Sequence, residues 1–269
     1  MVIDFHTHVF PEKIAAATVS ALHEKSGTPP HSDGTVAGLL SALESAGADI
    51  AVNLPVLTKP SQFESILKFA SGLNAQPYSG RRIISFAGIH PDDEDYYDRL
   101  AMIRDAGILG IKIHPDYQNT FIDSPAYVRI FERAKELGLI IVTHAGEDAA
   151  YVGQPVKCTP ARVLRLLDKI GGYDKFVLAH LGGNKMTADV IELLAGEKVY
   201  FDTSFSLHDA QKADFLTMVE KHGADRILFA TDSPWRDIGE ELEIFRSYNL
   251  GAETEEKILS ANARKLLGL

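Results

Sequence analysis

The chain opens on Val2-Ile3-Asp4-Phe5-His6-Thr7-His8, a short apolar run that ends in two histidines. Successive side chains of a β-strand point to opposite faces, so residues two apart share a face. His6 and His8 can therefore present two imidazoles to one metal ion. Burying two imidazoles side by side without an ion costs desolvation free energy and brings repulsion if either is protonated. The stretch thus predicts a metal centre at a strand end.

The same unit, an apolar run followed by an amphipathic stretch, recurs along all 269 residues. Runs rich in Val, Ile and Phe predict strands at 2–8, 49–57, 82–90, 108–115, 139–145, 175–181, 197–204 and 226–232. The predicted helices are 36–46, 62–73, 96–105, 125–137, 160–169, 188–194, 210–222 and 240–248, and a last one at 255–267. This rhythm predicts an α/β fold, a (β/α)8 TIM barrel of eight parallel strands with an extra C-terminal helix. An open doubly wound sheet is the alternative, because both folds repeat the same unit.

Several boundaries carry a local signal of their own. Ser124-Pro125 and Thr159-Pro160 each place a capping hydroxyl before a proline suited to the first helical turn. Glycines suited to end helices are Gly107, Gly138 and Gly171-Gly172. Residues 11–35 are predicted to be a long connection after the first strand, and such connections on the catalytic face tend to decide the substrate.

Composition limits the class of protein. No linker or low-complexity tract divides the chain, which favours one domain over 1–269. No apolar run is long enough for a membrane span and the N-terminus has no basic region before an apolar stretch, so a cytoplasmic protein is expected. The net charge of −10 argues against nucleic-acid binding and leaves a small molecule as the expected substrate. The single cysteine excludes an intramolecular disulfide and a Cys-based zinc site. A homo-oligomer is left open, because outer helices can contact solvent or a second copy.

Histidines gather at the ends of the predicted strands. Six of the ten lie there, namely His6, His8, His90, His114, His144 and His180. Asp232 ends the eighth predicted strand. In a barrel the carboxyl ends of the strands converge on one face, where the active site is built. Residues far apart in the sequence are therefore expected around one cavity.

Motifs along the whole chain resemble the amidohydrolase superfamily of metal-dependent barrels, in particular its amidohydrolase-related (amidohydrolase 2) branch. The opening stretch resembles the first-strand motif of that superfamily. Later segments resemble further motifs in the same order, at 110–115, 142–146, 179–183, 228–235 and 262–267. The chain is thereby similar to aminocarboxymuconate semialdehyde decarboxylase-like and TatD-like metal-dependent enzymes.

The resemblance implies two versions of the metal centre. With one ion, His6, His8, His144 and Asp232 bind it and His180 contacts its water. With two ions, His144 and His180 hold the second, and a carboxylated Lys112 supplies the bridge. Imidazoles with one carboxylate suit Zn²⁺, and also Mn²⁺, Fe²⁺ or Co²⁺. We favour one zinc ion, and Lys112 as a cation that neutralises the pocket or pairs with a substrate carboxylate.

The remaining candidates concern catalysis and substrate binding. Asp232 is expected to accept a proton from the attacking water, with His180 as the second catalytic residue. The expected substrate-binding residues are Lys112, His114, Trp235 and Arg236. Simple packing is the alternative for His114, and solvent exposure for Arg236. His90 is interpreted as shaping a turn. The surface histidines are predicted to be His23, His31, His208 and His222.

The favoured function is a metal-dependent hydrolase, in which a metal-activated water attacks an ester, lactone, amide or similar bond of a small carboxylated substrate. The alternative is a metal-dependent, non-oxidative decarboxylase or hydratase of an unsaturated or aromatic acid. Two further hypotheses carry less weight. A TatD-type nuclease conflicts with the acidic charge, and a non-catalytic metal-binding barrel conflicts with the full set of ligand residues.

Overall fold

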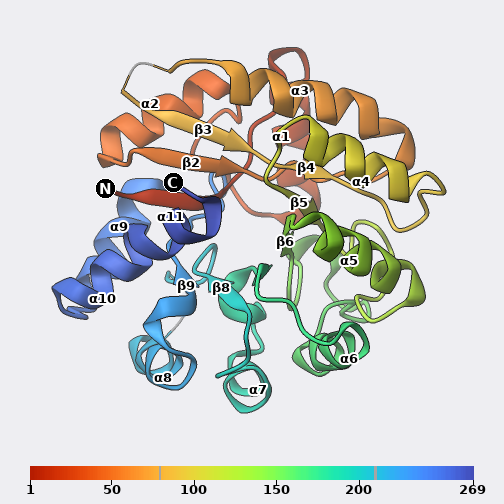
Figure 1. Ribbon diagram of the computed structural model, residues 1–269. Helices are drawn as coiled ribbons and strands as arrows, with labels where there is room; N and C mark the ends of the chain where they lie inside the picture. The colour runs from red at the N-terminus through yellow and green to blue at the C-terminus, as the bar shows by residue number, and fades with distance from the viewer. Residues whose placement is uncertain (79, 209–210) are drawn as a thin grey trace.

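A computed structural model describes residues 1–78, 80–208 and 211–269 of the protein. Figure 1 shows strands at the centre with helices ranged around them in chain order. The strands are β1 (Ile3–Thr7), β2 (Ile50–Asn53), β3 (Arg82–Ser85), β4 (Ala87–Gly88), β5 (Gly110–Ile113), β6 (Ile140–Thr143), β7 (Phe176–Leu178), β8 (Tyr200–Asp202) and β9 (Ile227–Leu228). Each strand pairs in parallel with the next along the chain, except for a break between β3 and β4.

The break between β3 and β4 lies at Phe86, inside the stretch predicted as one strand at 82–90. The Phe86 amide still donates to the Asn53 carbonyl at 2.9 Å, which continues the pairing with β2. β4 then pairs with β5. One barrel position is therefore shared by two short strands, each of which pairs with one neighbour.

Backbone hydrogen bonds join the segment after β9 to β1. The Phe5 amide donates to the Phe229 carbonyl at 2.9 Å, and the Asp232 amide donates to the His6 carbonyl at 2.9 Å. The His8 amide donates to the Ser233 carbonyl at 2.6 Å. These bonds close the ring of parallel strands, so the predicted TIM barrel is confirmed and the open sheet is excluded.

Eleven α-helices are described outside the three masked positions. They are α1 (Glu12–Ser26), α2 (Val36–Ala46), α3 (Phe63–Ala75), α4 (Tyr96–Asp105), α5 (Pro125–Leu137), α6 (Pro160–Ile170), α7 (Thr187–Leu193), α8 (Lys212–His222), α9 (Ile238–Ser247), α10 (Ala252–Glu256) and α11 (Asn262–Leu267). Short helical turns are η1 (Pro60–Gln62), η2 (Ala149–Tyr151), η3 (His180–Gly182), η4 (Ala224–Arg226) and η5 (Lys257–Ala261). The predicted helix 255–267 is thus α10, η5 and α11 in succession. The predicted start of the helix 210–222 lies outside the described residues.

The predicted caps are present. Ser124 accepts a hydrogen bond from the Tyr127 amide, and Thr159 accepts one from the Arg162 amide. Gly138 and Gly171 end their helices in the left-handed conformation, with φ of 69° and 66°. These local signals fixed both ends of α5 and α6 to within one residue.

The segment 11–35, predicted as a connection, contains the helix α1. Only Ala15 and Val19 of this helix are buried. Two buried positions do not produce the apolar stripe by which a helix is recognised in a sequence. The long connection predicted after the first strand is present, but Glu12–Ser26 of it is a helix that was not predicted.

The barrel interior is filled from the amino-terminal side. Phe5, Phe86 and Val142 belong to one buried cluster, which also contains Ala263 and Leu267 of α11. The register between β1 and β2 shifts between Asp4 and Thr7. Such a shift changes the face to which following side chains point. Phe5 can therefore pack in the core while His6 faces the cavity above it.

A second buried cluster lies between the strands and the surrounding helices. Cys158, the only cysteine of the chain, is fully buried there, and its carbonyl accepts a hydrogen bond from the Gly146 amide at 2.9 Å. Burial raises the pKa of its thiol. Among the described residues, no helix is long and apolar enough to cross a membrane.

Candidate active site

A cavity of about 450 Å³ opens at the carboxyl ends of the strands. The predicted metal-binding residues all line it, namely His6, His8, His144, His180 and Asp232. Three of the predicted substrate-binding residues also line it, namely Lys112, His114 and Trp235. The structure therefore brings residues from five barrel positions, at β1, β5, β6, β7 and β9, to one place, as the strand-end pattern predicted.

His8 is held in one tautomer by a backbone carbonyl. Its Nδ1 lies 2.8 Å from the Leu54 carbonyl oxygen, which can only accept a hydrogen bond. Nδ1 therefore carries the proton, and in the neutral ring Nε2 presents a lone pair. This Nε2 lies 3.0 Å from Asp232 Oδ1, which is also an acceptor. Two acceptors at this distance require a proton or a cation between them.

His6 is oriented in the same way by a carboxylate. Its Nδ1 lies 2.9 Å from Asp202 Oδ2, so Nδ1 donates and Nε2 presents its lone pair to the cavity. Burial, together with the charge of Lys112, lowers the pKa of His6 well below its ordinary value. The ring is therefore neutral, as a metal ligand must be. Its Nε2 lies 3.4 Å from Asp232 Oδ1.

His6, His8 and Asp232 each offer one ligand atom, and these atoms lie within 4.8 Å of one another. Burial alone would raise the pKa of Asp232, but the nearby imidazoles of His6 and His8 lower it below its ordinary value. Asp232 also has a φ of 73°, in the left-handed region that L residues rarely adopt. The backbone thus aims an ionised carboxylate at two imidazole lone pairs, and the donor set fits a divalent cation.

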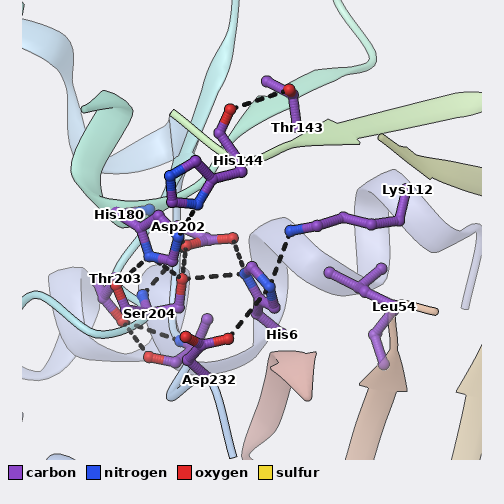
Figure 2. Close-up of polar contacts among 12 residues, drawn as sticks. His6, Leu54, Lys112, Thr143, His144, His180, Asp202, Thr203, Ser204 and Asp232 are labelled. Atoms are coloured by element: carbon purple, nitrogen blue, oxygen red, sulfur yellow. Dashed lines mark hydrogen bonds and ion pairs between the residues drawn. The ribbon is translucent and has the colours of Figure 1, made fainter. Parts of the chain in front are cut away.

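Lys112 lies on the floor of the cavity. The residue is 1% exposed, and Nζ donates to the lone pair of His6 Nε2 at 2.9 Å, a hydrogen bond that a metal ion on this nitrogen would replace. Figure 2 shows its amine and the Asp202 carboxylate on opposite sides of the His6 ring. Burial lowers the pKa of Lys112 to about 8, against the raising effect of nearby carboxylates. A cation of this kind can hold an anionic group of a substrate.

His180 and His144 form a directed chain (Figure 2). His180 Nδ1 lies 2.9 Å from the Ser204 carbonyl oxygen, so it donates, and His180 Nε2 accepts from His144 Nδ1 at 2.9 Å. His144 Nε2 is then left with a lone pair, and this buried atom has no hydrogen-bond partner among the described residues. The structure thus groups His144 with His180 rather than with His6, His8 and Asp232.

His114 contacts His144 through its ring face. The two rings stack with centroids 4.2 Å apart and planes 8° apart. His114, His144 and Asp148 have ligand atoms within 4.8 Å of one another. However, the in-plane lone pairs of parallel rings lie in separate planes and cannot converge on one ion. His114 Nδ1 accepts from the Tyr117 amide at 3.4 Å, so its Nε2 donates to Asp148, 3.3 Å away.

Arg236 is not brought to the cavity. Its guanidinium carbon lies 4.2 Å from the centroid of the Phe205 ring, and its Nε lies 3.9 Å from Glu241 Oε1. Arg236 is absent from the described residues that line the cavity. Its predicted contact with substrate therefore has no geometric support here.

The other histidines differ from one another. His90 Nδ1 accepts from the Asp92 amide at 3.1 Å, in keeping with its interpretation as part of a turn. His23, His31 and His208 are exposed. His222, predicted on the surface, is 6% exposed and stacks on Phe201. The helical pattern at 210–222 did not indicate that this last residue of α8 turns inward.

Sequence reasoning missed two polar groups that fix the histidines. Asp202 Oδ1 accepts from the amides of His180 and Ser204 at 3.0 and 3.1 Å, while Oδ2 binds His6. The Ser204 hydroxyl donates to Asp202 Oδ1 at 2.5 Å. A signal was present, since Asp202 lies near the end of the predicted strand 197–204, as the histidines do on theirs.

A family model described as Amidohydrolase matches residues 3–269. A 2,6-dihydroxybenzoate decarboxylase from Rhizobium has a similar structure, with a TM-score of 0.69, 18% identity, and 99% of this chain and 98% of that one covered. A candidate 2-pyrone-4,6-dicarboxylic acid hydrolase from Pseudomonas putida gives a TM-score of 0.68 at 17% identity, covering 99% and 97%.

A third similar structure is a 5-carboxyvanillate decarboxylase from Novosphingobium aromaticivorans with bound manganese. Its TM-score is 0.72 at 16% identity, and 100% of this chain and 96% of that one are covered. A search of curated proteins found no match. The solved structures share the fold with this chain at identities too low to transfer a reaction.

Proposed function

The chain belongs to the amidohydrolase family and is a metal-dependent enzyme of that superfamily, and on this premise we propose that it hydrolyses an ester, lactone, amide or similar bond of a small carboxylated substrate. One observation carries the proposal. The lone pairs of His6 and His8 meet the ionised Asp232 carboxylate at the end of the barrel, with both ring tautomers fixed from behind.

His6, His8 and Asp232 would hold the ion. His144 lies outside this group, but its buried Nε2 lone pair has no partner among the described residues, which supports it as the proposed further ligand. A divalent cation bound there supplies a Lewis acid and lowers the pKa of a water molecule toward about 7. Imidazole and carboxylate ligands suit zinc and manganese alike. The ligand chemistry supports zinc, and the manganese bound in similar solved structures supports manganese equally well.

The chain's own residues supply the proton transfers and the orientation. Asp232 is ionised at neutral pH because its pKa is lowered, so it can accept a proton from the attacking water and return it to the leaving group. His180 is held by Ser204 and Asp202 at the edge of the same space. Lys112 makes no ion pair with a carboxylate of the described chain, which leaves its charge for the substrate.

Decarboxylation of an aromatic or unsaturated acid is the second candidate. The solved decarboxylases of similar fold support it. In that reaction the carboxylate leaves as CO₂ and the reacting carbon gains a proton. A cation at Lys112 would stabilise the carboxylate of the substrate and so oppose its loss as CO₂. An ionised Asp232 has no proton to give to the reacting carbon. These two features favour hydrolysis.

A substrate screen on metal-loaded protein separates the two reactions. The panel contains lactones, esters and amides that carry one carboxylate, and phenols that carry a ring carboxylate. We expect hydrolysis products and one Zn or Mn ion per chain. Release of CO₂ without any hydrolysis would replace our proposal by the second candidate. Two tightly bound ions per chain would overturn the single-ion centre.

Asp232→Asn tests the role of the base. The amide cannot accept the proton, and we expect kcat to fall by about 10²–10⁴. Asp105→Asn, an exposed carboxylate on α4, is the control and should keep the activity of the parent. Metal content is measured alongside, because lost metal and lost proton transfer are different defects. Full turnover by metal-loaded Asp232→Asn would refute the assignment.

A further inference from the structure

Two helices form the outer walls of the active-site cavity. Ile14, Thr18, Leu22 and Ser26, spaced four apart on α1, all line it. Ser65, Ile66 and Phe69 of α3 line it as well. Residues three or four apart lie on one helix face, so each helix turns a single face to the cavity. The outer part of the cavity is therefore a groove between α1 and α3.

The groove exposes apolar side chains to solvent. Ile14 lines the cavity and is 50% exposed. Leu22, Ile66 and Phe69 also line it and are only half-buried. Water against these groups costs free energy that a ligand would recover on binding. The groove is continuous with the floor that holds Lys112, so one ligand can contact both.

Charge limits the polar end of that ligand. Lys112 is the one Lys or Arg among the described lining residues, and it lies on the floor. The other charged lining residues are the carboxylates Glu147, Asp148 and Asp232. One substrate carboxylate can pair with Lys112, whereas a second one, placed toward the groove, would meet apolar walls without a cation.

We propose that the substrate is a monocarboxylate with an extended apolar group, whose carboxylate pairs with Lys112 and whose apolar group lies between α1 and α3. The assignment rests on the proposed function for the position of the reacting bond beside Asp232. The cavity of about 450 Å³ reaches from Lys112 to both α1 and α3, a span that a simple one-ring acid would not fill. Ile14 and Leu22 are then specificity-determining residues.

Binding of unreactive probes tests the substrate class without any turnover. The probes are benzoate, 4-butylbenzoate, 4-butylbenzyl alcohol and 4-(3-carboxypropyl)benzoate, measured by calorimetry on metal-loaded protein. A buried methylene improves affinity by about fourfold. We expect 4-butylbenzoate to bind at least tenfold more tightly than benzoate, and more tightly than the alcohol or the dicarboxylate. Equal affinity of benzoate and 4-butylbenzoate would overturn the proposal, as would a preference for the dicarboxylate.

Ile14→Asp places a carboxylate in the groove at a position that is already half exposed. We expect its preference for 4-butylbenzoate over benzoate to fall below threefold. The matched control is Leu216→Asp on α8, since Leu216 is also an exposed apolar helix residue (39%) and does not line the cavity. The control should keep the full preference, and an unchanged preference in Ile14→Asp contradicts the assignment of the groove.

Lys112→Met examines the other end of the ligand. The variant should bind 4-butylbenzoate and 4-butylbenzyl alcohol with equal affinity, and a persisting preference for the acid would contradict the role of Lys112. The proposed function can fail independently. If the protein binds 4-butylbenzoate tightly but hydrolyses none of the screened compounds, the proposed hydrolase function fails and the proposed ligand class stands. If it hydrolyses short acids and shows no preference for the apolar tail, the hydrolase function stands and the ligand class fails.

Discussion

At the scale of single residues, carbonyls and a carboxylate behind the cavity fix where the imidazole protons lie. Leu54 and Ser204 accept from His8 and His180, and Asp202 accepts from His6. Each partner lies on the side of the ring away from the reacting space. The lone pairs are thus aimed before any ligand arrives, which reduces the reorganisation that binding requires.

The pair His6 and His8 could be predicted because both lie on one strand, where spacing alone decides the face. Asp202 lies near the end of a predicted strand, but its contact with His6 could not be predicted, and neither could that of Ser204. These contacts join residues 196 and 198 positions apart and depend on barrel register. The grouping of His144 with His180 likewise depends on ring orientation, which spacing does not determine. The sequence therefore predicted the members of the site better than their pairings.

His222 predicts a pH effect on stability. Burial lowers its pKa from 6.5 to about 4, and its ring donates to the Val199 carbonyl and accepts from the Gly196 amide. Between pH 6.5 and about 4, His222 is therefore protonated in the unfolded chain but not in the folded one. The stability it contributes is present above pH 6.5 and is lost as the pH falls toward 4.

We expect the parent to lose about 2 kcal/mol more unfolding free energy than His222→Gln between pH 7 and pH 5. Chemical denaturation at the two pH values measures this difference. His23→Gln, at an exposed histidine, is the control and should follow the parent. Parallel pH dependence of the parent and His222→Gln would show that His222 does not cause the effect.

At the scale of elements, the cavity wall α1 is anchored at its last turn. Lys25 Nζ lies 4.5 Å from the centroid of the Tyr117 ring and 3.9 Å from that of Tyr151. These rings follow β5 and β6, so a helix inserted after β1 is tied to the opposite side of the opening. Strand-helix units were predictable from periodicity, but α1 was not, because so little of it is buried.

Lys25→Ala should loosen α1. Cation–π contacts contribute about 0.5–1 kcal/mol at exposed sites, so we expect amide hydrogen exchange in α1 to accelerate by about two- to fivefold. Lys25→Arg keeps the cation and should exchange like the parent. The amides of α5, on another part of the barrel, serve as the internal reference. Identical exchange of α1 in the alanine variant and the parent would rule out this anchor.

At the scale of the whole molecule, Asp4 supports the closure of the barrel. Its carboxylate accepts from the Thr231 amide at 3.0 Å and hydroxyl at 2.6 Å, and from the His6 amide at 3.2 Å. It is fully buried between the first and last strand positions. Closure itself was beyond the reach of periodicity, because a barrel and an open sheet repeat the same strand-helix unit.

Asp4→Ala leaves these buried donors without an acceptor. We expect the free energy of unfolding to fall by about 3 kcal/mol, because each buried unsatisfied group costs roughly 1–3 kcal/mol. Asp105→Ala, at an exposed carboxylate, should change it by less than about 0.5 kcal/mol. Denaturant titration of both variants gives the comparison, and equal stabilities would show that Asp4 is dispensable for closure.

Because Cys158 is buried, we expect the native protein not to react with thiol-directed reagents. The chain has no second cysteine, and this one is fully enclosed with a raised pKa. A cysteine engineered at an exposed position of α1, such as Ala16, would therefore be the single reactive handle in the folded molecule. A fluorophore attached there would report the movement of the cavity wall during substrate entry without any background from the rest of the chain.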